Sequence, residues 1–374
     1  EPGTYKDRVL MERDPHQLIE GCLIAAYAIG AAQVFLYIRG EMAHAQERVA
    51  AALNEAYAAN LVGANILGTD FSVDIVLHWG AGAYIVGEET ALIESLEGNR
   101  GMPRLKPPYF PAAKGLYLKP TIVNNVETLS NLPWLMVHGA ESYKSVGSEA
   151  SPGTRLVAVS GHVNNPGVFE IPQGTTTYRD LFYGEQYGNG IRNGNELKMF
   201  IPGGASAPWF FPEQVDLPLE GRTVGAAGSM LGSGAIVVMD ETTDAVKACL
   251  RVVRFFARES CGKCSPCREG TSWEEKILQR ILDGHGRPSD LDLLLDVADN
   301  ISPGPYPVAA HPDAGLDAVP FPPRQTTICP LGPSSVAPIT SAIRRFRHEF
   351  EAKITRRNAL PVSAAPAAPA EVAP

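Results

Sequence analysis

The chain has 374 residues, of which 45% are hydrophobic, so its length and composition suffice for two or three domains with buried cores. It carries 32 Lys and Arg against 41 Asp and Glu, and the net charge of −9 argues against a surface that binds nucleic acid. The longest apolar run, Cys22 to Ile38, is broken by Gly30 and Gln33, which indicates two elements and no direct membrane insertion.

Alternating helices and strands are predicted from the start of the chain. Asp14, followed by a proline, predicts the N-cap of a first helix. The apolar run at 34–38 predicts a short strand buried on both faces. An alanine-rich amphipathic segment at 42–58 predicts a second helix, and residues 71–78 predict the next strand. This alternation predicts an α/β domain over residues 1–148.

A glycine-rich loop follows the second predicted strand. The segment Gly80–Gly87 precedes a helix expected to run to Glu97, and glycines before a helix allow backbone N–H groups to approach an anion. Ile85 stands where the third glycine of the dinucleotide fingerprint belongs. Glu88 and Glu89 replace the lysine and hydroxyl residue of a triphosphate-binding loop. The loop therefore indicates a phosphate-type site that is not built for a nucleoside triphosphate.

Several polar and aromatic residues near this loop could bind a ligand, but each of them also has a purely structural interpretation. They are Glu88, Glu89, Lys106, Tyr109, Phe110, Asn124 and Asn125. Carboxylates in a first helical turn complement the helix dipole, and paired asparagines before Val126 can cap a helix. A lysine is most often solvated, and aromatic residues beside prolines are most often packing anchors. Alone, none of these residues specifies a site.

The middle of the chain predicts a small β-rich domain over residues 152–235. Short strands are expected at 154–160, 167–171 and 197–201, because these apolar runs are separated by Pro and Gly turns. A helix is expected near 177–182. The composition alone would allow any small α+β fold.

Helical periodicity returns over residues 240–352, where we expect a helical bundle. Two apolar stripes predict its first two helices. The first stripe is Val246, Cys249, Leu250, Val253 and Phe256, and the second is Trp273, Ile277 and Ile281. Further helices are expected at 291–297 and 339–350. A Pro-rich loop is expected at 302–323, and a disordered Ala/Pro-rich tail at 353–374.

Three of the six cysteines, Cys261, Cys264 and Cys267, fall in one short run. Their spacing lets a tight turn aim the sulfurs at one point, which predicts a metal centre. Either tetrahedral zinc or a cubane iron–sulfur cluster needs four ligands, and Cys329 is the best candidate for the fourth. Zinc more often uses separated cysteine pairs or Cys/His mixtures, but it stays an alternative. Cys22 lies in an apolar run and, like Cys249, is expected on a buried helix face.

These motifs, in this order, resemble the NADH-binding flavoprotein subunit of respiratory complex I, the F subunit of NADH dehydrogenase I. The same family includes diaphorase subunits of NAD-dependent hydrogenases and formate dehydrogenases. The resemblance implies a Rossmann-like α/β domain, a small β-grasp domain of the soluble-ligand-binding type, and a helical bundle carrying an iron–sulfur cluster. It extends to about Phe350 and is carried by residues 1–8, 15–21, 80–92, 123–128 and 259–270.

The resemblance also implies FMN and a [4Fe-4S] cluster as cofactors, NAD(H) as substrate, and particular site residues. The cluster ligands match Cys261, Cys264, Cys267 and Cys329. The flavin-lining positions match Gly80, Gly82, Tyr84, Gly87, Glu88, Asn124, Asn125 and Thr128. Positions near the nicotinamide nucleotide match Glu1, Glu89 and Lys106, with Tyr109 or Phe110 as the aromatic face for adenine. Tyr84 and Glu89 are the candidate catalytic residues.

The expected function is electron input into an NADH:quinone oxidoreductase. A hydride carries two electrons whereas the cluster accepts one at a time, so a flavin must mediate and the Cys261 loop must lie near the flavin site. The alternatives are a diaphorase subunit of a hydrogenase or formate dehydrogenase and, in another class, a structural zinc-bearing scaffold. Expected partners are a thioredoxin-like [2Fe-2S] subunit and the large iron–sulfur subunit of the peripheral arm. The expected location is cytoplasmic, peripheral on the inner face of the cell membrane, or the matrix side in mitochondria.

One departure from the family concerns the flavin loop. The family's G-x-G-G-x-G-F-P-x-G stretch does not occur in this sequence, which begins at Glu1 without methionine. We therefore expect an N-terminally incomplete chain whose flavin affinity, taken alone, is severely reduced.

Overall fold

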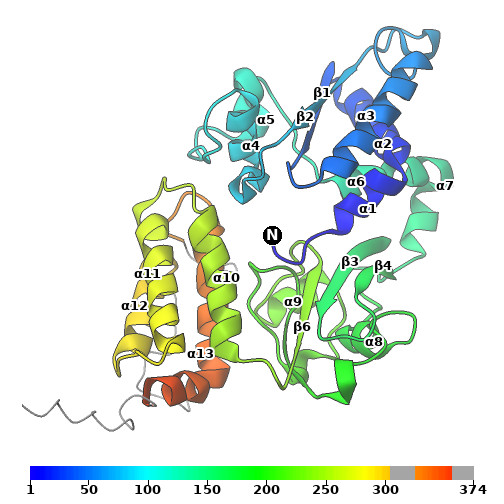
Figure 1. Ribbon diagram of the computed structural model, residues 1–374. Helices are drawn as coiled ribbons and strands as arrows, with labels where there is room; N and C mark the ends of the chain where they lie inside the picture. The colour runs from blue at the N-terminus through cyan, green and yellow to red at the C-terminus, as the bar shows by residue number, and fades with distance from the viewer. Residues whose placement is uncertain (304–324, 356–374) are drawn as a thin grey trace, which may run out of the picture.

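The computed structural model describes residues 1–303 and 325–355. Most of the loop expected at 302–323 and of the tail expected at 353–374 lies outside these residues. Figure 1 shows an α/β part with a two-stranded sheet, a part built on a four-stranded sheet, and a bundle of long helices. The N-terminal segment lies on the four-stranded sheet, where the Tyr5 hydroxyl donates to the carbonyl oxygen of Val159 at 2.9 Å.

The α/β part begins with two helices rather than one. The Asp14 side chain accepts a hydrogen bond from Gln17 N, which confirms the expected cap, but another helix precedes it. Strands β1 and β2 pair in parallel. Strand β1 is not buried on both faces as expected, because only Leu36 and Ile38 of its six residues are buried. A sheet of two strands leaves the other residues of β1 partly exposed. The elements are α1 (Lys6–Arg13), α2 (Pro15–Ile29), β1 (Gln33–Ile38), α3 (Ala43–Ala58), η1 (Ile66–Gly68) and β2 (Asp74–Trp79).

Short helices complete this part of the molecule. They are η2 (Tyr84–Gly87), α4 (Glu89–Leu96), α5 (Pro111–Lys114), η3 (Leu116–Leu118), α6 (Val126–Ser130) and α7 (Leu132–Lys144). Asn125 caps α6, as expected, through a hydrogen bond from Glu127 N at 3.0 Å. Helices α2 and α6 approach so closely at Gly21 that a Cβ atom there would lie 2.0 Å from the Leu129 carbonyl oxygen.

The four-stranded sheet has the order β4-β3-β6-β5, with β3 parallel to β6 and the other neighbours antiparallel. The three expected strands and the helix after Thr177 are present. The central strand β6 was not expected from the sequence, and with it the sheet continues beyond residue 235. The elements are β3 (Thr154–Gly161), β4 (Gly167–Pro172), α8 (Tyr178–Tyr183), η4 (Arg192–Gly194), β5 (Leu197–Ile201), η5 (Pro212–Gln214), α9 (Gly221–Ala226) and β6 (Ala235–Asp240).

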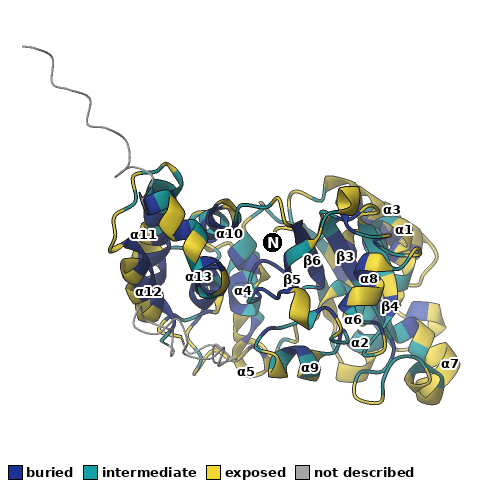
Figure 2. Ribbon diagram, turned by 90° about the horizontal axis from the view of Figure 1, so that it is seen from below, coloured by how far each residue is buried: buried dark blue, intermediate teal, exposed yellow. Residues whose placement is uncertain are grey.

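Four helices form the remaining part, α10 (Ala245–Glu259), α11 (Ser265–Leu282), α12 (Asp290–Ile301) and α13 (Leu331–Thr355). Their inward faces are buried, whereas much of α7 is exposed (Figure 2). The stripe expected on α10 is confirmed, and Cys249 is fully buried in it. The stripe expected on α11 is wrong at one position, because Trp273 is 54% exposed while Glu274 is fully buried. Cys22 is buried on α2, as expected.

Within the part of the chain that the structure describes, no helix combines the length and apolar character needed to cross a bilayer.

Replacing Gly21 by Ala should destabilise the protein by about 1–3 kcal/mol, because the methyl group would collide with backbone and force α2 and α6 apart. Gly225 is a matched control, since it is also helical and has no atom within 4 Å of an added Cβ. Gly225→Ala should be neutral or stabilising by up to about 1 kcal/mol. Urea unfolding followed by circular dichroism measures both, and equal effects would contradict the close approach.

Candidate functional site

The glycine loop lies at the carboxyl ends of the two parallel strands. Strand β1 leads into Gly40, and strand β2 leads into Gly80. A Cβ atom on Gly40 would lie 2.6 Å from the Gly80 carbonyl oxygen, and Gly82 has a φ of +88°. The two loops therefore meet backbone to backbone, which requires glycine. Ligands of open α/β sheets bind at the carboxyl ends of strands, so this edge is the candidate cofactor site.

Charged side chains surround this edge. The Arg39 guanidinium donates two hydrogen bonds to the Glu41 carboxylate, at 3.0 and 2.7 Å, and lowers the pKa of Glu41 to about 2. The Glu1 carboxylate accepts hydrogen bonds from the Ser206 backbone N–H and hydroxyl, at 3.1 and 2.7 Å. Ser206 belongs to the part of the molecule built on the four-stranded sheet. Groups from two parts of the molecule thus meet near the glycine loop.

Tyr84 connects the glycine loop to the helical bundle. Its backbone N–H donates to the Glu259 carboxylate at 2.9 Å, and its ring packs against Phe255 with centroids 5.0 Å apart. Burial raises the pKa of the Tyr84 hydroxyl. Glu259 is the last residue of α10 and immediately precedes the cysteine segment. Helix α10 therefore ends in the Glu259 carboxylate, which binds the backbone of the glycine loop at Tyr84.

A second contact joins the same two segments. The Lys263 ammonium, between two of the cysteines, donates to the Pro103 carbonyl oxygen at 2.7 Å. The turn between α10 and α11 accordingly lies beside the part of the molecule that holds α4 (Figure 1). This arrangement agrees with the expectation that the Cys261 loop lies close to the Gly80–Gly87 segment.

The four predicted cluster ligands share one core. Cys267 and Cys329 are buried in it, and Cys261 and Cys264 pack against it. The segment before Cys329 contacts the cysteine turn directly, because Ile328 N donates to Cys264 Sγ at 3.3 Å. Burial raises the pKa of Cys267 to about 11 and that of Cys329 to about 12. Thiolates here need a compensating positive charge, which fits a site for bound iron.

The separation of these thiols also bears on the kind of metal. Among residues 1–303 and 325–355, no three His, Cys, Asp or Glu side chains are close enough to hold one metal ion. A zinc ion would draw all four sulfurs to about 2.3 Å from a single point. Each cysteine of an iron–sulfur cluster instead binds its own iron, so the ligands stand farther apart. A zinc ion and an iron–sulfur cluster thus place different demands on the spacing of the four sulfurs.

Lys106 is held by two carboxylates. Its ammonium donates to Glu88 at 3.0 Å and to Glu89 at 2.5 Å. Glu88 also caps α4, because it accepts hydrogen bonds from the backbone N–H groups of Thr90 and Ala91, both at 2.9 Å. Burial opposes ionisation of Glu88, but these hydrogen bonds and Lys106 outweigh it, so the pKa of the carboxyl is lowered. Glu88 thus has a structural role at the start of α4, as its helix N-cap rather than in the first turn as expected, and a ligand contact stays a prediction.

The other predicted residues are less closely gathered. Asn124, Asn125 and Thr128 lie exposed at the start of α6, and Asn125 donates to Asp7 of α1 at 3.0 Å. Tyr109 and Phe110 are 37% and 52% exposed, so either ring could receive an adenine. Gly87 has open space around it. Of the groups that sequence reasoning missed, Glu259 stands directly before the cysteine run, whereas Arg39, Glu41 and Ser206 carry no local signal.

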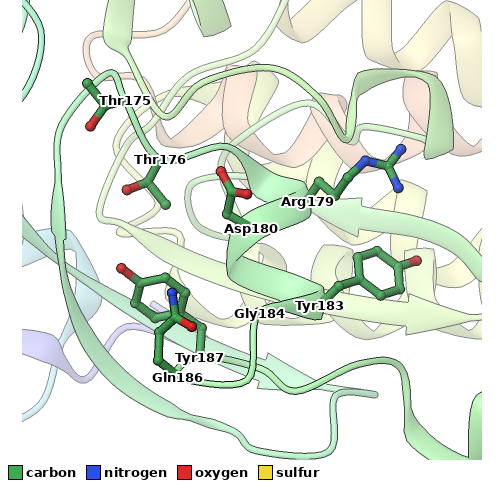
Figure 3. Close-up of a pocket in the computed structure, with 8 residues that line it drawn as sticks. All are labelled: Thr175, Thr176, Arg179, Asp180, Tyr183, Gly184, Gln186 and Tyr187. Carbon is green, nitrogen blue, oxygen red and sulfur yellow. The ribbon is translucent and has the colours of Figure 1, made fainter.

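One pocket of the molecule lies elsewhere. It has a volume of about 460 Å³ and lies beside α8 in the part built on the four-stranded sheet (Figure 3). Arg179, on its wall, is already paired with Asp216 at 2.5 Å. None of the predicted cofactor residues lines this pocket, so we do not place the redox site there.

Two family models match this chain. One, described as the Nuo51 FMN-binding domain, matches residues 1–134, and the other, the NADH-ubiquinone oxidoreductase-F iron-sulfur binding region, matches residues 247–306. The NADH-quinone oxidoreductase F subunit of Mycobacterium tuberculosis is 47% identical over 354 residues, which are 95% of this chain and 74% of the relative. The chain belongs to this F-subunit family. The Streptomyces coelicolor member is 47% identical over 357 residues, and the Escherichia coli member 44% over 354 residues, with 96% and 95% of this chain and 74% of each relative covered.

A solved structure has the same fold as this family member. The NAD+-reducing [NiFe]-hydrogenase in its H2-reduced state matches with a TM-score of 0.78 and 33% identity. The match covers 95% of this chain and 55% of the hydrogenase chain, so our chain spans about half the length of that neighbour. The predicted family is confirmed, and so are FMN and a [4Fe-4S] cluster as its cofactors.

Glu88→Ala should destabilise the protein by about 1 kcal/mol, because α4 loses its cap and Lys106 loses a partner. The folded pKa of Glu88 lies below its usual 4.5, so its stabilisation is fully present above pH 4.5 and is lost as the pH falls through the lowered value. Melting temperatures measured across this range should show the variant and the wild type converging in acid. Glu141→Ala, which removes an exposed ion pair with Lys144, is the control and should change little.

Proposed function

We propose that this protein is the electron-input subunit of an NADH:quinone oxidoreductase, which takes electrons from NADH and passes them singly to iron–sulfur centres. The observation that carries the proposal is the hydrogen bond from Tyr84 N–H to Glu259, at 2.9 Å, in a member of the F-subunit family. This bond joins the glycine loop, which we propose to line the flavin, to the residue that precedes the cysteine turn. Electron transfer between two cofactors requires this proximity, and a purely structural metal site would not.

The glycine edge fits a flavin, because the backbone at Gly40 and Gly80 comes together closely where the loops after β1 and β2 meet. FMN, when bound, accepts a hydride and releases the two electrons one at a time. Tyr84, packed on Phe255, would shield one side of the site from water, and Tyr84 and Glu89 are our candidate catalytic residues. The residues proposed to line the flavin are Gly80, Gly82, Tyr84, Gly87, Glu88, Asn124, Asn125 and Thr128.

The nicotinamide nucleotide would lie on the charged side of this edge. Lys106 offers a cation for its phosphates, and Tyr109 or Phe110 offers a ring for adenine stacking. Glu1 and Glu89 would accept hydrogen bonds from the sugar and carboxamide groups. Support comes from the exposure of both rings and from the position of Lys106 between two helix-terminal carboxylates.

The cluster would be held by Cys261, Cys264, Cys267 and Cys329. Two polar groups of the protein already approach these sulfurs, since Ile328 N lies 3.3 Å from Cys264 Sγ and Ser260 Oγ lies 3.3 Å from Cys267 Sγ. Hydrogen bonds to sulfur tune the reduction potential of a cluster. The protein therefore contributes both ligands and tuning groups.

We infer a finer layout from the same resemblance. The α/β part corresponds to a Rossmann-like domain near residues 1–148, the four-stranded sheet to a β-grasp domain starting near residue 152, and α10–α13 to the bundle that holds the cluster. A thioredoxin-like [2Fe-2S] subunit and a large iron–sulfur subunit are the proposed partners. The complex would be attached to the inner face of the cell membrane, or to the matrix side in mitochondria.

A second candidate function is that of a diaphorase subunit in an NAD+-reducing hydrogenase. The structural match to such an enzyme, with a TM-score of 0.78, favours it specifically. The 47% identity to the NADH-quinone oxidoreductase relatives exceeds the 33% to the hydrogenase and supports the first proposal. Purifying the native complex and assaying NADH-dependent quinone reduction beside hydrogen-dependent NAD+ reduction separates the two.

Replacing Cys329 by Ala should abolish the [4Fe-4S] signal in electron paramagnetic resonance of the reduced complex, because the fourth ligand is lost. Iron should fall from roughly four atoms per chain, and NADH:quinone activity should disappear. Cys22→Ala is the matched control, since Cys22 is buried on α2 far from the other thiols in sequence. A full signal in the Cys329 variant would contradict the ligand assignment.

Lys106→Met should raise KM for NADH about tenfold and change kcat little, because a cation that binds ground state and transition state alike is removed. Steady-state kinetics of the complex with NADH and ferricyanide measures both constants. Lys119→Met, on an exposed residue outside the proposed site, serves as the control. An unchanged KM in the Lys106 variant would remove Lys106 from the nucleotide site.

A further inference from the structure

A carboxylic acid lies buried in the core that contains the cluster ligands. The buried face of α11 has the spacing of an amphipathic helix, and it consists of Cys267, Gly270, Thr271, Glu274, Ile277, Leu278 and Ile281. Glu274 is the one acid in this stripe and is 0% exposed. Its neighbour Trp273, which would be the ordinary core residue, is turned outward. An isolated carboxyl in such a place needs a physical explanation.

Within the described residues, neither carboxyl oxygen of Glu274 has a hydrogen-bond partner. The Ser335 hydroxyl of α13 by itself would lower the pKa of Glu274, but burial outweighs its effect. The hydrogen of this hydroxyl is engaged with the Gly332 carbonyl oxygen at 2.7 Å, which leaves its oxygen as an acceptor for Glu274. A protonated carboxyl could donate to this oxygen, whereas an ionised one would find no donor. The site thus favours the neutral acid.

The surroundings supply no compensating cation in the part of the chain that the structure describes. Helix α10 faces Glu274 with the Cys249 thiol, whose pKa is raised by burial and then by Glu274 itself. Helix α12 faces the stripe with the apolar Val297 and Ile301, which meet it at Gly270. The basic Arg254 of α10 is paired with Glu275 at 2.8 Å and does not reach Glu274. Burial raises the pKa of Glu274 to about 8.

Glu274 lies within the electrostatic reach of the cluster site without touching it. It stands two helical turns after Cys267, a rise of about 10 Å along α11. The carboxyl nevertheless acts on the Cys267 thiol through the intervening core. Charges at this distance interact appreciably in a protein interior because water does not screen them.

We propose that Glu274 is a proton-linked tuning residue of the cluster, which binds a proton when the cluster accepts an electron. The inference rests on the proposed function, because it requires the cluster at the four cysteines. The electron reaches the cluster from the flavin, and the proton comes from solvent. One O–H bond forms at the Glu274 carboxylate, and the added negative charge is offset. The potential of the cluster then falls with rising pH around the pKa of this one acid.

The test is a redox titration of the cluster in the intact complex, followed by electron paramagnetic resonance from pH 6 to 10. In the wild type the midpoint potential of the cluster should decrease as the pH rises. The total decrease should be about 59 mV for each tenfold difference in the proton affinity of Glu274 between the reduced and the oxidised cluster. Glu274→Gln, which cannot ionise, should give a potential independent of pH. Glu274→Leu is a second variant, with the volume and polarity of an ordinary core residue, and should also be flat.

Glu275→Gln is the matched control, because Glu275 is adjacent, partly exposed and paired with Arg254; it should keep the wild-type pH dependence. A flat wild-type profile, or a sloping one in both Glu274 variants, would overturn the inference. Infrared difference spectra of the wild type give an independent readout, since reduction near pH 8 should produce the carbonyl band of a protonated acid, and its absence would also overturn it. A complex without any cluster would instead refute the proposed function.

Discussion

One hydrogen bond, from Tyr84 N–H to the Glu259 carboxylate, joins the two halves of the candidate redox site. It links the loop after β2 to the end of α10, immediately before the cysteine turn. The contact between Lys263 and Pro103 repeats the link a few residues farther on. Ile85 and Val86 of the glycine-loop segment belong to the same hydrophobic core as the bundle helices. The distance between the two cofactor segments is therefore set by packing and not by a flexible connection.

The core of the helical bundle contains ionisable side chains whose neutral forms are favoured by burial when no metal is bound. The thiols of Cys267 and Cys329 and the carboxyl of Glu274 all have raised pKa values because the surrounding core excludes water. An iron–sulfur group would supply the positive charge that the thiolates require. The α/β part has the opposite character, since Arg39, Glu41, Lys106 and Glu88 are paired ions near a solvent-exposed edge.

Local sequence signals predicted the structure correctly where a single residue determines a local feature such as a helix cap. Asp14 and Asn125 cap the helices that they were expected to cap, and the helix expected near Thr177 is present. The apolar stripe of α11 was wrong at one position, because an exposed tryptophan and a buried acid reverse the usual preference and only tertiary packing decides between them. The contact between Glu1 and Ser206 could not be foreseen either, since it joins segments far apart in the sequence with no periodicity to relate them.

Strand β6 was missed for a different reason, since its central place in the sheet depends on a parallel pairing with the distant β3. The cysteine ligands were the easiest part of the site to predict, because their crowding has a chemical cause. Their division between two segments has a mechanical consequence. A cluster bound to Cys267 and Cys329 would cross-link α11 to the start of α13 and restrict the unfolded chain, an effect worth roughly 4 kcal/mol for a loop of this size. The cluster would then both carry electrons and stabilise the fold.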